Sequence, residues 1–486
     1  MYMSSKPSKL ISLRSRDRAI EPVVIKNQER KSSERGTSSP LVVLYSFIAL
    51  ISVGTLFLML PFSSVTGDIN LVDAIFTATS AATVTGLTVL DTPTIWSIWG
   101  QIIIAILIVI GGIGFMTGAA FFLLAAGQTL GLQGRRLIGQ NLGEEKMGSI
   151  GQIVVRVVLS ALLFQLIGFI IFFLLFSIKL GLEEISQNIW YSIFHSISSF
   201  NNAGFTIFQM GNNLEPFARG YLNNIILIVT AIMFFFGGLG YFVISDLLSH
   251  RRVLGKRKIK IVLSLETKLI LIGSFVLSLF GLMMIMIFEY SNPATIGNMS
   301  LSEKIINSLF TSMSTRTAGF NSFDFSATYD YTKLLCALLI FIGGAPASTA
   351  GGIKITTFLL SMFMISNHIL GRENITAFGR EIPYETGVRA IVILVLSVLI
   401  IGLLIVTVSF IEREYQFVNL TFEIFSAYGT NGMTAGVSPD IKLTSKIIFI
   451  ITMVIGRLGP MTLALLLAGS QKKFEYRFFQ EKVRIG

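Results

Sequence analysis

Four short stretches of the chain share one spacing of Phe, Ser and Gly. In each stretch a Ser follows a Phe by four residues, and a Gly follows that Ser by five or six residues. The four sets are Phe76, Ser80 and Gly86; Phe194, Ser198 and Gly204; Phe310, Ser314 and Gly319; and Phe422, Ser426 and Gly432. Successive glycines stand 118, 115 and 113 residues apart, which indicates an internal fourfold repeat.

The chemistry that these stretches offer lies in their backbone. Gly permits conformations that a side chain forbids, and it lets a ligand approach the backbone closely. Rings of backbone carbonyls replace the hydration shell of a monovalent cation, so we predict that such a cation binds at these carbonyls. The predicted ligand residues are Thr83, Val84, Thr85 and Gly86; Asn201, Asn202, Ala203 and Gly204; Arg316, Thr317, Ala318 and Gly319; and Gly429, Thr430, Asn431 and Gly432. Arg316 should point away from the ions, because its charge would repel them. For any single Gly, helix packing is the alternative.

The sequence shows no arrangement typical of an enzyme. Its three histidines, His195, His250 and His368, are far apart, and the single Cys336 lies in an apolar run. No nucleophile–base pair, phosphate-binding loop or metal-ligand spacing is present. We therefore expect no enzymatic activity and no organic cofactor, and we read the net charge of +11 as a matter of membrane topology, with no nucleic-acid partner.

The elements that position these stretches are membrane spans. Of the 486 residues, 52% are hydrophobic and 13% are charged, about half the charged share of a soluble domain. A helix that crosses a bilayer needs roughly 20 apolar residues. Eight runs are long enough: 41–61, 100–126, 152–177, 221–248, 265–289, 333–367, 389–411 and 443–469.

The distribution of basic residues predicts the orientation. The two tails and the connections 127–151, 249–268 and 368–388 together carry 26 Lys and Arg residues, whereas the four longer connections carry 6. By the positive-inside rule both termini are cytoplasmic, and the longer connections start from the outer face. The basic tail 1–40 is typical of a cytoplasmic segment near anionic lipid, with a docking arm for a regulatory partner as the alternative.

Each longer connection also holds an apolar stretch too short to span. We predict short re-entrant helices at 70–82, 188–200, 302–314 and 417–427, each followed by an extended Gly-containing stretch. Irregular backbone at membrane depth is tolerated where it lines a water-filled cavity. The predicted fold is thus an all-α integral membrane protein with eight transmembrane helices, built as four M1–P–M2 repeats around a pseudo-fourfold pore. Its parts are the tail 1–40, the repeats 41–126, 152–248, 265–367 and 389–470, and the tail 471–486.

The sixth span and the last span carry features that a plain membrane helix lacks. The sixth reads FIGGAPASTAGGIK in its middle, where glycines and a proline interrupt a helix. The last carries Arg457 near its midpoint, where a charge must face the protein interior. We predict that residues 343–352 form a movable loop under the carbonyls and that Arg457 binds it; a packing kink and a purely structural Arg457 are the alternatives. The predicted gate residues are Gly343, Gly344, Ala345, Ser348, Thr349, Gly351, Gly352, Lys354 and Arg457.

The segments TVTGL, SSFNNAGF, STRTAGF and SAYGTNGM, each between two spans, resemble the filter segments of the Trk/Ktr/HKT potassium transporter superfamily. The resemblance covers roughly residues 40–470, and eight spans favour its KtrB branch. It implies a potassium-selective pore in the plasma membrane, a homodimer, and a cytosolic KtrA-like regulatory subunit with a nucleotide-binding fold. Gly86 stands where sodium-preferring members have Ser. Asn431 departs from the pattern, because an apolar residue is typical there.

The main rival is a coupled secondary transporter. Such proteins usually show inverted repeats and discontinuous helices at the midplane. Here the repeat is parallel, because two spans return each unit to the same side. The sequence still leaves sodium open as an activating ion, and it leaves open a sodium- or proton-coupled cation symporter.

Overall fold

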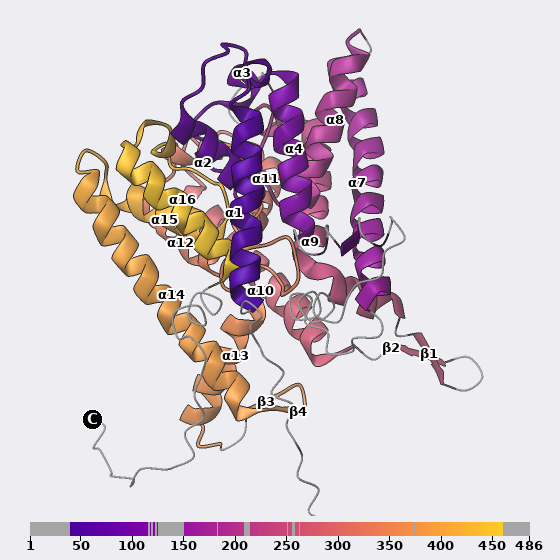
Figure 1. Cartoon of the computed structure of the whole chain (residues 1–486). Coiled ribbons are helices and arrows are strands. Elements are labelled where there is room, and N and C mark those ends of the chain that lie inside the picture. Colours follow the sequence, from indigo (N-terminus) through magenta and orange to yellow (C-terminus); the bar gives the residue numbers. More distant parts are fainter. Residues whose placement is uncertain are drawn as a thin grey trace, which may run out of the picture. The chain divides into compact units, whose positions relative to one another are not determined.

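The computed structural model describes residues 39–114, 117, 120–121, 124, 150–181, 183–208, 214–249, 251–254, 258–261, 263–372 and 375–459 (Figure 1). The predicted tail 471–486 and nearly all of the tail 1–40 lie outside these residues, as does the connection 127–149. The described part is mostly helical, in agreement with an all-α membrane protein. Two short hairpins, which the sequence did not lead us to expect, add β1 (Arg251–Leu254) with β2 (Lys258–Ile261), and β3 (Ile375–Ala377) with β4 (Arg380–Ile382).

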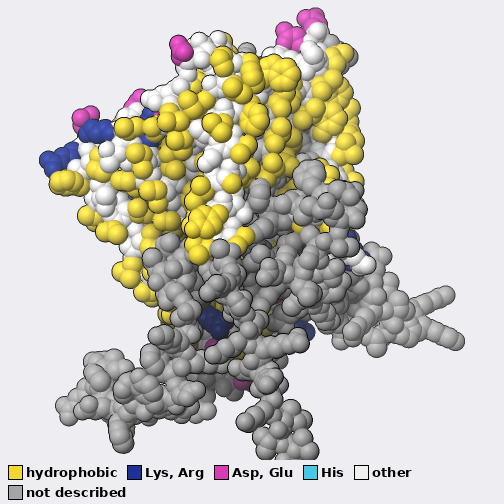
Figure 2. Space-filling model, viewed as in Figure 1, with side chains coloured by type: hydrophobic (Ala, Val, Ile, Leu, Met, Phe, Trp, Pro, Cys, Tyr) yellow, Lys and Arg dark blue, Asp and Glu magenta, His cyan; other side chains and the backbone are white. Residues whose placement is uncertain are grey.

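Five helices of the described residues are long and apolar enough to cross a membrane. They are α1 (Ser39–Leu58), α7 (Ile150–Leu180), α9 (Tyr221–Ser249), α10 (Leu265–Glu289) and α14 (Tyr384–Ile411). In the most apolar 18-residue stretch of α7 only 28% is buried inside the protein, and in that of α14 only 17% is buried. Figure 2 shows the result as broad hydrophobic surfaces with acidic side chains at one rim. Apolar patches of this extent indicate contact with lipid.

The other predicted spans contain shorter helices, because the backbone breaks inside them. Helix α4 (Ile98–Ile113) ends at Gly114, and α16 (Leu443–Leu458) ends at Gly459; both glycines have positive φ. The sixth predicted span is two helices, α12 (Asp330–Phe341) and α13 (Ile355–Ile369). Residues 342–354 connect them, and we call this segment the crossing loop.

Four short helices lie in the four longer connections. They are α2 (Leu71–Ala82), α8 (Ile185–Phe200), α11 (Leu301–Ser314) and α15 (Phe417–Gly429). Local sequence fixes where two of them begin. The side chain of Asn70 accepts a hydrogen bond from the Val72 backbone at the start of α2, and Ser300 forms a capping box with Glu303 at the start of α11.

Contacts between these helices close a ring in chain order. Each short helix packs against the helix that precedes it. In addition, α4 contacts α8, α9 contacts α11, α12 contacts α15, and α16 contacts α2. Each of these four helices follows one short helix along the chain and contacts the short helix of the next unit, and the fourth unit returns to the first. The stretches that follow the short helices consequently meet in one place.

Candidate ion-binding site

Each of the four repeated glycines packs against the residue that precedes the next repeated Gly. The four contacts together form a closed cycle. A methyl group added to Gly86 would overlap the carbonyl oxygen of Ala203, and one added to Gly204 would lie 3.0 Å from that of Ala318. On Gly319 it would overlap the oxygen of Asn431, and on Gly432 that of Thr85. All four glycines have positive φ, between 70° and 96°. We call this cycle, with the three residues before each Gly, the glycine ring.

A second set of positive φ angles stands two residues before each Gly. It comprises Val84 (57°), Asn202 (60°), Thr317 (95°) and Thr430 (46°). A left-handed conformation costs a residue with a side chain roughly 1–2 kcal/mol. Such strain persists where the surroundings over-determine the backbone, and it clusters at functional sites. Its recurrence at four matched positions shows that all four stretches share this local backbone feature.

The repeated serines hold these stretches to the short helices. Ser80 accepts a hydrogen bond from the Gly86 amide (3.0 Å), and Ser426 accepts one from the Gly432 amide (3.1 Å). Ser198 and Ser314 instead donate to the carbonyl one residue after the Gly, on Phe205 and Phe320, both at 2.7 Å. The sequence repeat therefore has a physical reason that spacing alone did not reveal. The repeated phenylalanines are all buried.

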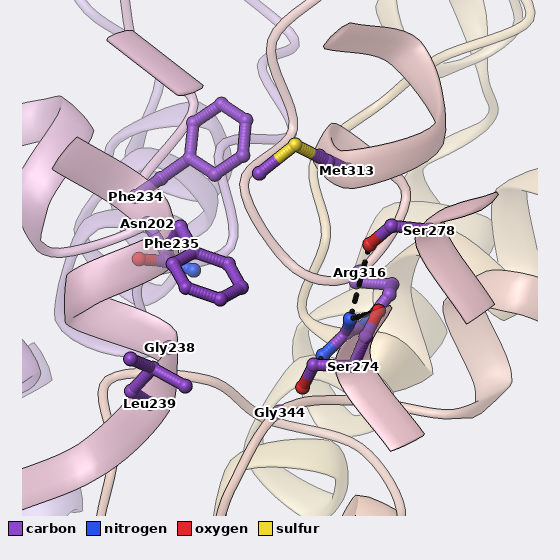
Figure 3. A pocket seen from close by; sticks show the side chains of 10 residues that line it. All are labelled: Asn202, Phe234, Phe235, Gly238, Leu239, Ser274, Ser278, Met313, Arg316 and Gly344. Atoms are coloured by element: carbon purple, nitrogen blue, oxygen red, sulfur yellow. Dashed lines mark hydrogen bonds between the residues drawn. The ribbon is translucent and has the colours of Figure 1, made fainter. Parts of the chain in front are cut away.

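The glycine ring consists of the sixteen predicted ligand residues, and all of them except Arg316 are buried. The half-buried Arg316 turns to α10, where it donates to the Ser274 carbonyl (2.8 Å) and to the hydroxyls of Ser274 (2.8 Å) and Ser278 (3.3 Å). Figure 3 shows it on one side of a small pocket, with Phe234 and Phe235 of α9 opposite. Asn431, the departure from the family pattern, donates to the Ser314 carbonyl of the third unit (2.7 Å).

The crossing loop lies against the glycine ring. The hydroxyl of Thr349 is 3.1 Å from the side-chain amide of Asn202, and a methyl group on Gly351 would overlap the Thr430 hydroxyl. The Ala345 amide donates to the carbonyl of Gly238 in α9 (3.0 Å). A loop of the third unit therefore contacts the second and the fourth.

Arg457 binds the crossing loop, as the sequence predicts. Its guanidinium donates to the carbonyls of Thr349 and Gly111, the latter at 2.6 Å, and so it also ties α16 to α4. Lys354 donates to the Ala350 carbonyl within the loop (2.6 Å). Neither cation forms an ion pair with a carboxylate among the described residues. Backbone oxygens take the place of a counter-ion, which a buried charge requires.

A further repeat, which the sequence analysis missed, lies within the second predicted span of each unit. It reads GGIG at 111–114, GGLG at 237–240, GGAP at 343–346 and GRLG at 456–459. Gly114, Gly240 and Gly459 all have positive φ, and in three units the first Gly of the motif packs on the end of its own short helix. In the third unit Gly343 packs on Gly351 of the crossing loop instead. Arg457 occupies the second position of the motif, where the other units have Gly.

The fold and the glycine ring define a helical, multi-pass membrane protein in which four repeated stretches pack against one another in a closed cycle. The chain belongs to the TrkH family of cation transport proteins, whose family model matches residues 19–476.

Relatives agree with this assignment. The chain is 36% identical over 423 residues to Ktr system potassium uptake protein B of Bacillus subtilis, covering 87% of this chain and 91% of that protein. It is 34% identical to potassium/sodium uptake protein NtpJ of Enterococcus hirae, over 94% of this chain and 99% of that protein. The crystal structure of the potassium transporter TrkH from Vibrio parahaemolyticus has the same fold, with a TM-score of 0.65 at 19% identity, covering 90% of this chain and 86% of that one.

Proposed function

We propose that this protein carries potassium into the cell through a pore whose selectivity filter is the glycine ring. The observation that carries the proposal is the closed cycle in which each Gly packs on the carbonyl of the residue before the next Gly. Oxygens arranged in this way can replace the water around a monovalent cation. The short helices enter from the outer face in the predicted topology, and their carboxyl ends meet at the ring, where their dipoles favour a cation.

Potassium is the cation that the residues and the relatives favour. Gly86 supplies a position without a side chain in the first unit, so all four units offer the same backbone. The names of two relatives, a potassium uptake protein and a potassium/sodium uptake protein, support potassium as the transported ion. The second name also includes sodium as a transported ion. Sodium as an activating ion stays a prediction, and a sodium- or proton-coupled symporter is the second candidate.

The crossing loop and Arg457 act as the gate in this proposal. The loop contacts Asn202 and Thr430 in the ring, so it stands in the path of an ion that leaves the ring. Arg457 adds a positive charge there and holds the loop through the Thr349 carbonyl. Release of the loop would remove both obstacles.

The remaining parts of the proposal concern assembly and location. We propose a homodimer in the plasma membrane with cytoplasmic termini, controlled by a cytosolic nucleotide-binding subunit of the KtrA type. The Ktr system name of a relative supports a partner subunit. The hairpins β1–β2 and β3–β4 fall in connections that the charge distribution assigns to the cytoplasm, so they are available to such a subunit.

Cation flux through the purified protein in liposomes tests this function. With opposed potassium and sodium gradients, we expect the wild type to favour potassium and Gly86→Ser to lower that preference. Gly67→Ser is the matched control: Gly67 also has positive φ (79°), but a methyl group there meets nothing within 4 Å. Unchanged selectivity in Gly86→Ser would show that the ring is not the filter. Potassium movement only alongside a second ion would favour the symporter.

A further inference from the structure

Helix α15 of the fourth unit contains a buried carboxylate that the proposed function does not use. Glu423 follows the repeated Phe422 by one residue and has no exposed surface. The matched positions in the other three short helices hold Thr77, His195 and Thr311. The fourth unit is therefore the one that places an acidic side chain at this position.

Every hydrogen bond that Glu423 accepts comes from the segment that follows the ring. One carboxylate oxygen accepts from the Thr434 hydroxyl, the Ala435 amide (3.0 Å) and the Val437 amide (3.2 Å). The other accepts from the Ser438 hydroxyl (2.6 Å). This segment begins two residues after Gly432, so Glu423 holds the outer continuation of the fourth filter stretch.

The pattern of donors also orients carbonyl groups. In a trans peptide the N–H and the preceding C=O point in opposite directions. Because the amides of Ala435 and Val437 point at Glu423, the carbonyls of Thr434 and Gly436 point away from α15. The Glu423 carboxylate therefore lies on one side of the segment 434–438, and the carbonyl oxygens of Thr434 and Gly436 face the opposite side.

No basic side chain balances this charge among the described residues. Elsewhere on the outer side, Asp73 pairs with Lys446 at 2.7 Å and Glu412 lies 3.9 Å from Lys442. Glu423 has four hydrogen-bond donors and no ion pair. Burial by itself disfavours a charged carboxylate, and four donors of this kind oppose that effect without cancelling the charge. A fixed charge in surroundings that exclude water acts over a longer distance than one in water.

We propose that Glu423 supplies a fixed negative charge that concentrates potassium at the outer mouth of the pore. This inference rests on the proposed function, since it assigns a role within the same pore. Glu423 is a positioning residue that acts on the ion through space and through the segment 434–438. It differs from the ring, which contacts the ion and discriminates between ions.

The test separates charge from hydrogen bonding. Glu423→Gln keeps an oxygen for Thr434, Ala435 and Val437, and its amide can donate to the Ser438 hydroxyl, so the segment stays anchored while the charge is lost. Glu423→Asp keeps the charge, and Glu423→Leu removes both. Glu289→Gln is the matched control: Glu289 is also fully buried and accepts hydrogen bonds from Asn292, Thr295, Tyr329 and Thr332, but it joins α10 to α12 and not to a filter stretch.

The measurement is potassium uptake into liposomes as external potassium is varied, at low and at high choline chloride. For Glu423→Gln we expect the half-saturating potassium concentration to rise about threefold to tenfold at low ionic strength, with a smaller rise at high ionic strength. The potassium/sodium preference should stay near that of the wild type. Glu423→Asp should restore much of the wild-type half-saturation, and Glu289→Gln should match the wild type.

Two results would overturn the inference while leaving the pore intact. In the first, Glu423→Gln keeps the wild-type half-saturating potassium concentration while Glu423→Leu impairs uptake. Glu423 would then serve only to anchor the segment 434–438. The other is the same shift in Glu289→Gln, which would make the effect general to buried carboxylates. A wild type that shows no potassium preference would instead overturn the proposed function, and this inference with it.

Discussion

The glycine ring and the crossing loop are both irregular backbone inside a helical membrane protein, but they are held in different ways. In the ring, each stretch is fixed by its own short helix and by the backbone of the next stretch, and eight residues keep positive φ. The crossing loop has two such residues, Ala347 and Gly352. Its bonds to other units come from Arg457, from the Thr349 hydroxyl and from a few backbone amides.

Under the proposed function, the ring is the part that must be rigid and the crossing loop is the part that can be released. A change at one Gly of the ring moves the carbonyl of its neighbour and, through the cycle, affects all four units. A change at one side chain of the loop removes one or two hydrogen bonds and leaves the rest of the loop in place. Selectivity should therefore depend on the ring, and the rate of conduction on the loop.

The largest effect should follow from breaking the ring at Gly432. In Gly432→Ala the added methyl group overlaps the Thr85 carbonyl and lies 2.8 Å from the Cα atom of Gly86, in a backbone conformation with φ of 96°. Because neither atom belongs to a flexible side chain, the first stretch must shift. We expect the potassium/sodium preference measured by liposome flux to fall more than about tenfold.

Gly436→Ala is the control for this change. Gly436 also has positive φ (88°), but its added methyl group would make only an ordinary contact, at 3.5 Å from the Cβ atom of Ser326. It should keep most of the preference. Equal losses in the two variants would mean that backbone strain alone, and not the packing of the cycle, sets selectivity.

A smaller and different effect should follow from releasing the loop at Arg457. Arg457→Gln loses the charge and at least one of the bonds to the carbonyls of Thr349 and Gly111. Hydrogen bonds to charged groups contribute about 1.5–3 kcal/mol each, so we expect potassium flux to rise about tenfold or more while the potassium/sodium preference stays. Arg389→Gln, at an exposed position on α14, should leave flux unchanged. A loss of selectivity in Arg457→Gln would contradict the division between ring and loop.

The sequence could predict the parts of this site that depend on residue type. The four matched glycines could be recognised in the sequence, because only a residue without a side chain fits at these positions. The break in the sixth span could be recognised from its glycines and its proline. The positive φ of Val84, Asn202, Thr317 and Thr430 gave no such signal, because tertiary contacts impose it on ordinary residues. The bond from Arg457 to Gly111 joins residues 346 positions apart, so no local pattern could reveal it. The roles of the ring and the loop in ion flow stay predictions.

The smallest effect should appear where the two regions touch. Asn202 belongs to the ring, where its side-chain amide lies 3.2 Å from the Thr317 hydroxyl, and it also contacts the Thr349 hydroxyl of the loop at 3.1 Å. Thr349→Val removes the hydroxyl at nearly constant volume and leaves the backbone carbonyl that Arg457 binds. One hydrogen bond is worth about 1 kcal/mol, so we expect about a fivefold change in flux.

A double-mutant cycle with Asn202→Ala sharpens this last prediction. If the contact transmits the position of the loop to the ring, the effects of Thr349→Val and Asn202→Ala on flux should not add, because the two residues form one contact. The potassium/sodium preference should change only in the variants that lack Asn202, which also lose its contact with Thr317. Additive effects on flux would show that the loop and the ring work independently, and that their proximity at this point has no functional consequence.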